Sequence, residues 1–189
     1  MDHTADELIN VVLFEPEIPQ NTGNIMRTCV AAGVTLHIIG PVGFDIDNPE
    51  FRRASTNHIT WAEYTLYDSW QDFAEKNEGE YFFMTRYGKV PPSDIDFKKA
   101  SESSKIYLIF GKESTGIPGE ILRANLDRCF RIPMSADCRC LNLSNACAIA
   151  IYEALRQLDY PGLSFKEEQK GEDFLEQNYS YDATLRRKK

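Results

Sequence analysis

Short apolar runs alternate with segments of helical pattern along most of this chain, and this alternation constrains the fold more than any other feature. The runs are rich in β-branched and aromatic residues and are expected to be strands over residues 9–16, 34–40, 80–88, 105–111 and 129–134. Residues 59–67 are expected to add another short strand. Strands that alternate with helices favour an α/β fold with a mostly parallel sheet flanked by helices.

The segments between these runs are expected to be helices over residues 21–33, 69–77, 118–126 and 141–158. Asn21 or Thr22 can cap the first helix and Gly33 can end it, while Ser69 can cap the second. The last helix is the most strongly indicated, because its apolar residues recur every three to four positions. Residues 90–104 are expected to form a surface loop.

The length of 189 residues fits one domain, which we expect over residues 1–162, followed by a polar tail over 163–189. No apolar run is long enough to span a membrane, and the acidic start lacks the pattern of a signal peptide. A cytoplasmic location is therefore expected. The net charge of −8 counts against general nucleic-acid binding, so any RNA is expected to bind a local patch.

The chain has five cysteines, an odd number that excludes complete internal pairing, and they are expected to be reduced thiols. Cys138 and Cys140 form a C-x-C pair, which has no second pair nearby and is a poor signal for a metal site. We therefore expect no bound metal.

Three polar loops follow predicted strands, at the positions where parallel sheets bind ligands. They are "EPEIPQNTGNIMR", "GKESTGIP" and "MSADCRCLNLSN". The second does not match a phosphate-binding loop, because Lys112 directly follows the first glycine and Glu113 would repel a triphosphate. No glycine-rich dinucleotide motif follows the first strand, so both nucleotide interpretations are disfavoured.

The other two loops carry polar residues that allow two interpretations each. Asn21, Asn24 and Arg27 are spaced by three and share roughly one helix face, where they can hold a phosphodiester or a sugar hydroxyl. The same spacing also fits a helix cap beside a surface arginine. At the start of the last helix any one polar residue can be the N-cap, which leaves two unexplained among Asn142, Ser144 and Asn145.

Taken together and in this order, the loops resemble the SPOUT superfamily of RNA methyltransferases. "EPEIPQNTGNIMR", "FGKESTGIP" and "RIPMSADCRCLNLSNACAIAIYEALRQ" are similar to its three motifs, and "FRRAS" is similar to its usual Arg-Arg segment. The similarity covers about residues 10–162. It is greatest for the branch that 2′-O-methylates the wobble nucleotide of tRNA, a cytidine or modified uridine at position 34.

The resemblance implies an α/β fold with a C-terminal trefoil knot, in which the last helix passes through an earlier loop, and it implies a homodimer. It also implies S-adenosylmethionine as cofactor, held among apolar groups and backbone amides. The positions that match the family's cofactor contacts are Met84, Thr85, Gly111, Gly116, Ile132, Met134, Cys140, Leu141 and Asn145. Gly111 and Gly116 are expected to let the backbone approach the cofactor. Cys140 stands where the family commonly has serine, so no role of that hydroxyl carries over.

The implied reaction transfers the cofactor's methyl group to a ribose 2′-oxygen, with a leucine tRNA as the expected substrate. Arg27 matches the family's catalytic arginine, and because a guanidinium keeps its proton we expect it to position a phosphate and stabilise a developing alkoxide. Glu113 matches the acidic residue and is expected to orient Arg27, while Asn142 is expected to fix the ribose or a loop around it. The expected RNA contacts are Asn21, Asn24, Arg52, Arg53 and His58.

Two alternatives remain open from the sequence. A non-catalytic RNA-binding or assembly factor of the same fold would bind RNA without affinity for the cofactor, and the net charge of −8 gives this some weight. A thiol or metal site would use Cys138 and Cys140 with His58 as the remaining partner.

Overall fold

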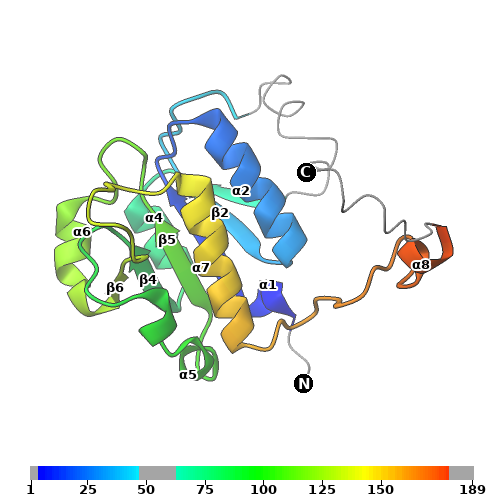
Figure 1. Ribbon diagram of the computed structural model, residues 1–189. Coiled ribbons are helices and arrows are strands. Elements are labelled where there is room, and N and C mark those ends of the chain that lie inside the picture. The colour runs from blue at the N-terminus through cyan, green and yellow to red at the C-terminus, as the bar shows by residue number, and fades with distance from the viewer. Residues whose placement is uncertain (1–3, 47–62, 179–189) are drawn as a thin grey trace.

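The computed structural model describes residues 4–46 and 63–178, and the strands in this part form a single parallel sheet (Figure 1). The strand order is β3-β2-β1-β5-β4-β6. The strands are β1 (Ile9–Phe14), β2 (Thr35–Ile39), β3 (Tyr64–Tyr67), β4 (Glu80–Met84), β5 (Ile106–Phe110) and β6 (Cys129–Phe130). Every neighbouring pair is parallel, so the expected α/β fold with a parallel sheet is confirmed.

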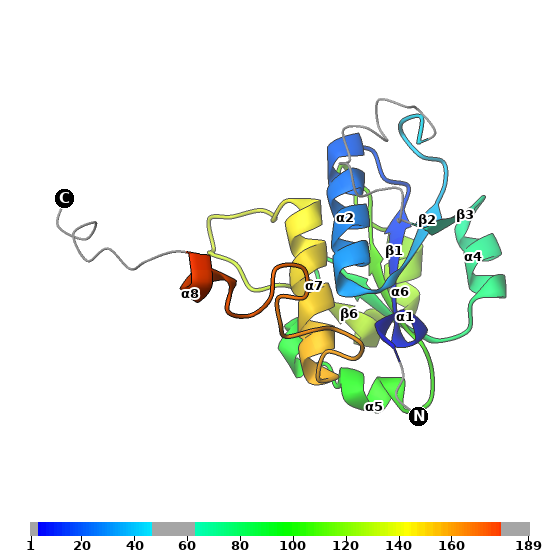
Figure 2. The same cartoon turned by 90° about the vertical axis from the view of Figure 1, so that its right-hand side faces the viewer.

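Helices cover both faces of the sheet, because the central strands are apolar on both sides. In β1, Val11 and Leu13 pack into one core cluster with α2 and α7, whereas Val12 and Phe14 pack into a second cluster with α4 and α6 (Figures 1 and 2). The helices are α1 (Ala5–Leu8), α2 (Pro19–Ala32), α4 (Trp70–Lys76), α5 (Phe97–Ser101), α6 (Gly119–Ala124), α7 (Leu143–Gln157) and α8 (Phe174–Asn178). The result is a three-layer domain with β1 and β5 at its centre.

Helix α2 begins earlier than expected. Its first residue is Pro19, and its N-cap is Ile18, which provides no side-chain cap. Proline suits this position because its missing N–H would have had no partner in the helix. The prediction that Asn21 or Thr22 caps the helix is therefore wrong, and both lie buried in its first turn. The expected end at Gly33 is confirmed, with φ 62° at that residue.

The prediction of a surface loop over 90–104 is wrong. This stretch contains a short 3₁₀ helix, η2 (Pro92–Asp94), and α5. Phe97 is fully buried and packs edge-on against Phe82, and its N–H donates to Gln157 Oε1 of α7 at 3.0 Å. Asp96 caps α5 by accepting from the Lys99 N–H.

Two strands end four residues sooner than expected. β4 stops at Met84, and the chain turns over residues 85–88. β6 has only two residues, and the following Arg131 N–H donates to the Val90 carbonyl at 2.9 Å in place of a regular ladder. Pro133 then has no N–H with which to continue the pairing.

A chain of buried polar side chains runs through the second core cluster. His37 Nε2 lies 3.0 Å from Asn10 Oδ1, and His37 Nδ1 lies 2.9 Å from the Tyr67 hydroxyl. The Asn10 amide donates to the Ile106 carbonyl at 3.3 Å, and the Tyr67 hydroxyl lies 3.4 Å from Asn77 Oδ1. Because Asn10 offers its oxygen, His37 donates from Nε2 and accepts from Tyr67 at Nδ1. This assignment uses the single Tyr67 proton, so the half-buried Asn77 oxygen at 3.4 Å receives no hydrogen bond from it, and we call Asn10, His37 and Tyr67 the inner chain.

After α7 the described chain packs against the core as far as Leu163. The following segment, which ends with α8, is almost entirely exposed, and both views place α8 away from the sheet (Figures 1 and 2). Among the described residues no helix is both long and apolar enough to cross a bilayer.

Candidate active site

The three polar loops meet at the carboxyl edge of the sheet. The first follows β1 and leads into α2, and the second follows β5, which lies beside β1. The third connects β6 to α7, and α7 lies next to α2 (Figures 1 and 2). Loops far apart in sequence are therefore neighbours, as the sequence predicts for one ligand site.

Glu113 joins the first two loops. Its Oε2 accepts from the Glu17 N–H at 3.0 Å, and its Oε1 accepts from Asn21 Nδ2 at 2.9 Å. Both carboxylate oxygens are thus occupied by donors of the β1–α2 segment. Its hydrogen bonds go to Asn21 and the Glu17 backbone, so any orientation of Arg27 by Glu113 would be indirect, through the start of α2, and it stays a prediction.

Asn142 joins the third loop to the other two. Its Nδ2 donates to Asn21 Oδ1 at 2.9 Å, and its Oδ1 accepts from the Ser144 N–H at 3.0 Å and the Ser144 hydroxyl at 2.6 Å. The same oxygen lies 3.4 Å from the Asn145 N–H, so Asn142 is also the N-cap of α7. We call Glu113, Asn21, Asn142 and Ser144 the edge network. One amide therefore both caps α7 and links the third loop to α2, while a role of Asn142 toward the ribose stays a prediction.

Two further contacts hold the first loop against the second, and sequence reasoning missed them. Lys112 Nζ lies 2.5 Å from Glu15 Oε2, and this hydrogen bond raises the pKa of the Lys112 ammonium. Glu17 accepts from the Ser114 hydroxyl at 2.7 Å and from the Ser114 N–H at 2.9 Å, and these bonds hold the pKa of Glu17 below its usual value. The two acidic residues of "EPE" could have indicated these contacts from the sequence, because "GKES" offers one lysine and one serine as partners.

Gly111 and Gly116 are required by the loop itself. A Cβ on Gly111 would lie 2.3 Å from the Gly116 carbonyl carbon, because the loop folds back and the Gly116 N–H donates to the Lys112 carbonyl at 2.9 Å. Gly116 has φ +75° and open space around it, so its need for glycine is conformational. The expected approach to a cofactor stays a prediction at both positions, beside this structural reason.

The polar residues of α2 do not all share one exposed face. Asn21 is 6% exposed and both ends of its amide are bonded, which gives it a positioning role rather than an open RNA contact. Asn24 and Arg27 are exposed. Arg27 forms no ion pair with the described part of the chain, so its guanidinium is available to an external anion. Arg52, Arg53 and His58 lie outside the described residues.

Apart from Met84 at the end of β4, the predicted cofactor residues lie in the chain that follows β4, β5 and β6, or in the first turn of α7. Thr85 is buried and its N–H donates to the Phe130 carbonyl at 3.0 Å, which ties the end of β4 to β6. Ile132 is buried, whereas Cys140 and Leu141 are exposed. The remaining positions are half-buried or exposed: Met84, Met134 and Asn145.

The five cysteines divide sharply by environment. Cys138 and Cys140 are exposed, while the other three are buried as free thiols. Burial raises the pKa of Cys29 to about 12 and raises the pKa of Cys129 and Cys147 as well. Within residues 4–46 and 63–178 no three His, Cys, Asp or Glu side chains gather in a way that could hold a metal ion.

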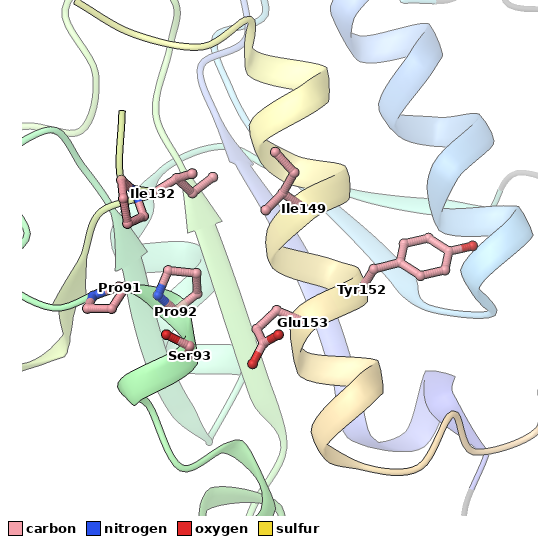
Figure 3. Close-up of a pocket in the computed structure, with 8 residues that line it drawn as sticks. Pro91, Pro92, Ser93, Ile132, Ile149, Tyr152 and Glu153 are labelled. Carbon is pink, nitrogen blue, oxygen red and sulfur yellow. The ribbon is translucent and has the colours of Figure 1, made fainter. Parts of the chain in front are cut away.

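An apolar pocket of about 360 Å³ lies beside this edge, between η2, the chain after β6, and α7 (Figure 3). Its lining residues are Pro91, Pro92, Ser93, Ile132, Pro133, Ile149, Tyr152 and Glu153. Ile149 and Glu153 extend from α7 toward Pro92 and Ser93, whereas Tyr152 points toward α2 (Figure 3). Only Ile132 is shared with the predicted cofactor residues.

Known proteins match both the sequence and the fold. The model of the SpoU rRNA Methylase family matches residues 8–152. The tRNA (cytidine(34)-2'-O)-methyltransferase of Escherichia coli K12 is 40% identical over 162 residues, which cover 85% of this chain and 100% of that protein. A Geobacillus stearothermophilus protein whose assignment to the same activity is provisional is 47% identical over 157 residues, covering 82% of this chain and 99% of its own length.

Solved structures agree. One, described as giving insight into 2-OH methylation of C/U34 on tRNA, has a TM-score of 0.73 and 36% identity, and covers 82% of this chain and 98% of that chain. An rRNA methyltransferase from Sinorhizobium meliloti with bound AdoMet has a TM-score of 0.71 and 28% identity, covering 86% of this chain and 60% of that one. The resemblance drawn from the three loops is thereby confirmed, and the chain belongs to the SpoU rRNA methylase family of methyltransferases.

Proposed function

We propose that the protein transfers a methyl group from S-adenosylmethionine to the ribose 2′-oxygen of the wobble nucleotide of tRNA, a cytidine or modified uridine, with a leucine tRNA as substrate. The observation that carries the proposal is the edge network, which joins the three motif loops at one end of the sheet and holds the start of α2, the helix that carries Arg27. The activity named for the 40% identical relative supports it.

The ends of β4, β5 and β6 fit the cofactor. Met84 and Leu141 offer partly exposed apolar surface, and Ile132 lies below the surface at the same edge. An adenine needs apolar walls and a few backbone hydrogen bonds, so the lack of a charged anchor there is no obstacle. When bound, S-adenosylmethionine supplies a methyl group activated by its sulfonium. The protein is then left to align the ribose and to manage the charge on its oxygen.

Arg27 is the residue that acts on the substrate. Its exposed guanidinium can donate to a phosphate oxygen of the RNA and stabilise the negative charge that develops on the 2′-oxygen. Asn24 lies one turn earlier and is exposed as well, so it can hold the same backbone. Glu113 and Asn142 are positioning residues, since they fix the start of α2 through Asn21 and thereby the direction of Arg27.

The protein is proposed to act as a homodimer in the cytoplasm. Val30 on α2 and Ile149 and Tyr152 on α7 are 39%, 45% and 43% exposed, and the latter two also line the pocket. A second copy that covers these adjacent helices would remove this surface from water. We further propose that residues 1–162 form the methyltransferase domain, with α7 passed through a trefoil knot, and that 163–189 form a separate tail.

The test compares Arg27→Ala with Arg123→Ala, a matched loss of an exposed arginine on α6. Arg27→Ala is expected to lower methyl transfer to leucine tRNA by about 100-fold, because it removes a charge that stabilises the transition state. Affinity for S-adenosylmethionine, measured by calorimetry, should stay within about twofold, since Arg27 is not a proposed cofactor contact. Arg123→Ala should change neither.

Nucleoside mass spectrometry of the tRNA product identifies the methylated position. Equal loss of transfer and cofactor affinity in Arg27→Ala would show that Arg27 is misassigned. A wild-type protein that binds RNA but has no affinity for S-adenosylmethionine would instead be a non-catalytic RNA-binding factor.

A further inference from the structure

The turn after β4 is held firmly against β6. The Thr85 N–H donates to the Phe130 carbonyl at 3.0 Å, and the Gly88 N–H donates to the Thr85 carbonyl at 3.2 Å. Inside the turn, the Tyr87 N–H donates to Thr85 Oγ1 at 3.3 Å. Thr85 is only 9% exposed, so the base of the turn belongs to the core.

The far end of the turn is fixed as well. A Cβ on Gly88 would lie 2.2 Å from the Phe130 carbonyl carbon, which shows that the backbone at Gly88 lies directly on β6. Two residues later, the Val90 carbonyl accepts from the Arg131 N–H at 2.9 Å. The chain on both sides of Tyr87 is therefore anchored to the same strand.

This anchored turn presents an aromatic ring and a cation to solvent. Tyr87 is 73% exposed, and the guanidinium carbon of Arg86 lies 5.5 Å from the centre of its ring. A single exposed tyrosine is ordinary on a protein surface. A ring held on a fixed turn, with an arginine over one face, is the arrangement that binds the flat face of an unpaired base.

Tyr and Arg are common in protein interfaces as well, but the position of the turn favours nucleic acid as the partner. Met84 pairs with Phe110 in the sheet, so Thr85 lies level with Gly111 at the carboxyl edge. Tyr87 thus follows the proposed cofactor contacts by two residues. Because the net charge is −8, RNA has to bind where there is local positive charge, and Arg86 supplies such a charge at this turn.

We propose that Arg86 and Tyr87 form a stacking site for an unpaired nucleobase of the RNA substrate. The ring of Tyr87 receives the base, and Arg86 contacts the base or the adjoining phosphate. The proposal rests on the proposed function, because it assumes that RNA binds this edge of the sheet. This contact would distinguish unpaired from paired RNA, and neither Arg27 nor the edge network provides such a distinction.

The experiment measures the binding of a fluorescently labelled anticodon stem–loop RNA and of a fully paired RNA of equal length. Tyr87→Ala is expected to weaken stem–loop binding by about 5- to 100-fold, the effect of losing one stacked base. Tyr87→Trp should retain stem–loop binding within about threefold, and both Tyr87 variants should bind the paired RNA as the wild type does. Arg86→Gln should weaken binding and lower its dependence on salt, because one cationic contact is lost.

Phe165→Ala is the matched control, because Phe165 is 83% exposed on the segment after α7. It should bind the stem–loop like the wild type, and every variant should keep the wild-type affinity for S-adenosylmethionine. Unchanged stem–loop binding in Tyr87→Ala, with normal methyl transfer, would overturn the stacking site and leave the proposed function intact. Loss in Phe165→Ala equal to that in Tyr87→Ala would also overturn it. A wild-type protein that binds no RNA would overturn both proposals.

Discussion

The edge network and the inner chain are both runs of hydrogen-bonded polar side chains, but they lie in different environments. In the inner chain, Asn10, His37 and Tyr67 are 2%, 6% and 5% exposed and bond across adjacent strands. In the edge network, Glu113 is half-buried and Asn142 is exposed, and the bonds join three loops. A polar group enclosed by the sheet therefore mainly supports the fold, whereas one at its edge fixes loops while leaving them open to a ligand.

The largest expected effect is on the inner chain and appears when the pH is lowered. Burial lowers the pKa of His37 from 6.5 to about 4, and the charge of Lys105 adds to the shift. The unfolded chain binds a proton below about pH 6.5 that the folded chain resists until about pH 4. The free energy of unfolding is therefore unaffected by His37 above pH 6.5, falls as the pH drops toward 4, and then levels off. The loss amounts to about 3 kcal/mol, of which about 1.4 kcal/mol is reached by pH 5.5.

Urea unfolding of the wild type and His37→Gln near pH 7.5 and near pH 5.5 checks this. Glutamine cannot bind the proton, so the variant should lack this part of the pH dependence. Equal losses in the two proteins would assign the dependence to other groups.

The next effect is on the edge network. Glu113→Gln keeps the shape of the side chain but turns an amide NH₂ toward either the Glu17 N–H or the Asn21 amide, which are both donors. We expect methyl transfer to fall by about 100-fold, because small displacements of positioning groups cost that much. The free energy of unfolding should change by less than about 1 kcal/mol.

Glu120→Gln is the control for this change, since Glu120 is an exposed carboxylate in the first turn of α6. It should transfer methyl groups like the wild type. A Glu113→Gln protein that loses stability instead of activity would place the edge network in the same class as the inner chain.

A smaller effect is expected from Tyr67→Phe. This change removes the hydroxyl that lies 2.9 Å from His37 Nδ1 and leaves that nitrogen buried without a donor. We expect a loss of about 1–2 kcal/mol in the free energy of unfolding, with unchanged methyl transfer. Tyr64→Phe on the same strand is the control, because the Tyr64 hydroxyl has no hydrogen-bond partner in the described structure, and it should unfold like the wild type.

The smallest effect is expected from Ser114→Ala at the edge. The exposed hydroxyl bond to Glu17 is lost, while the backbone N–H bond remains. The free energy of unfolding should change by less than about 0.5 kcal/mol, and the rate of methyl transfer should change by less than about twofold. The pKa of Glu17 should move back toward its usual value, because the Ser114 hydroxyl is the main cause of its lowering. Titration of the Glu17 carboxyl by NMR measures this directly, and an unmoved pKa would contradict it.

The two networks also differ in how far the sequence predicts them. The residues of the edge network stand out as polar residues after apolar strands, so Asn21, Glu113 and Asn142 could be selected from their positions. Their partners could not, because a loop's hydrogen bonds depend on the path of the other loops. His37 lies inside an apolar run, and nothing in that run indicates that Asn10 and Tyr67 flank it on adjacent strands.

The same distinction applies to the fold. Strands were predictable because the runs are apolar on both sides, as a sheet covered by helices requires. Helix α5 was missed because its five residues are too few for a periodic pattern, although Asp96 before Phe97 has the form of a cap. The start of α2 was predicted too late, because Pro19 begins the helix without any side-chain cap.

Asn142 carries two tasks on opposite ends of one amide. Its oxygen starts α7, and its nitrogen holds Asn21. Deamidation to aspartate would replace that nitrogen with a second oxygen. The helix start would be kept, but the new oxygen and Asn21 Oδ1 would then be two acceptors facing each other. Deamidation of this one side chain is therefore expected to lower activity while the fold is retained.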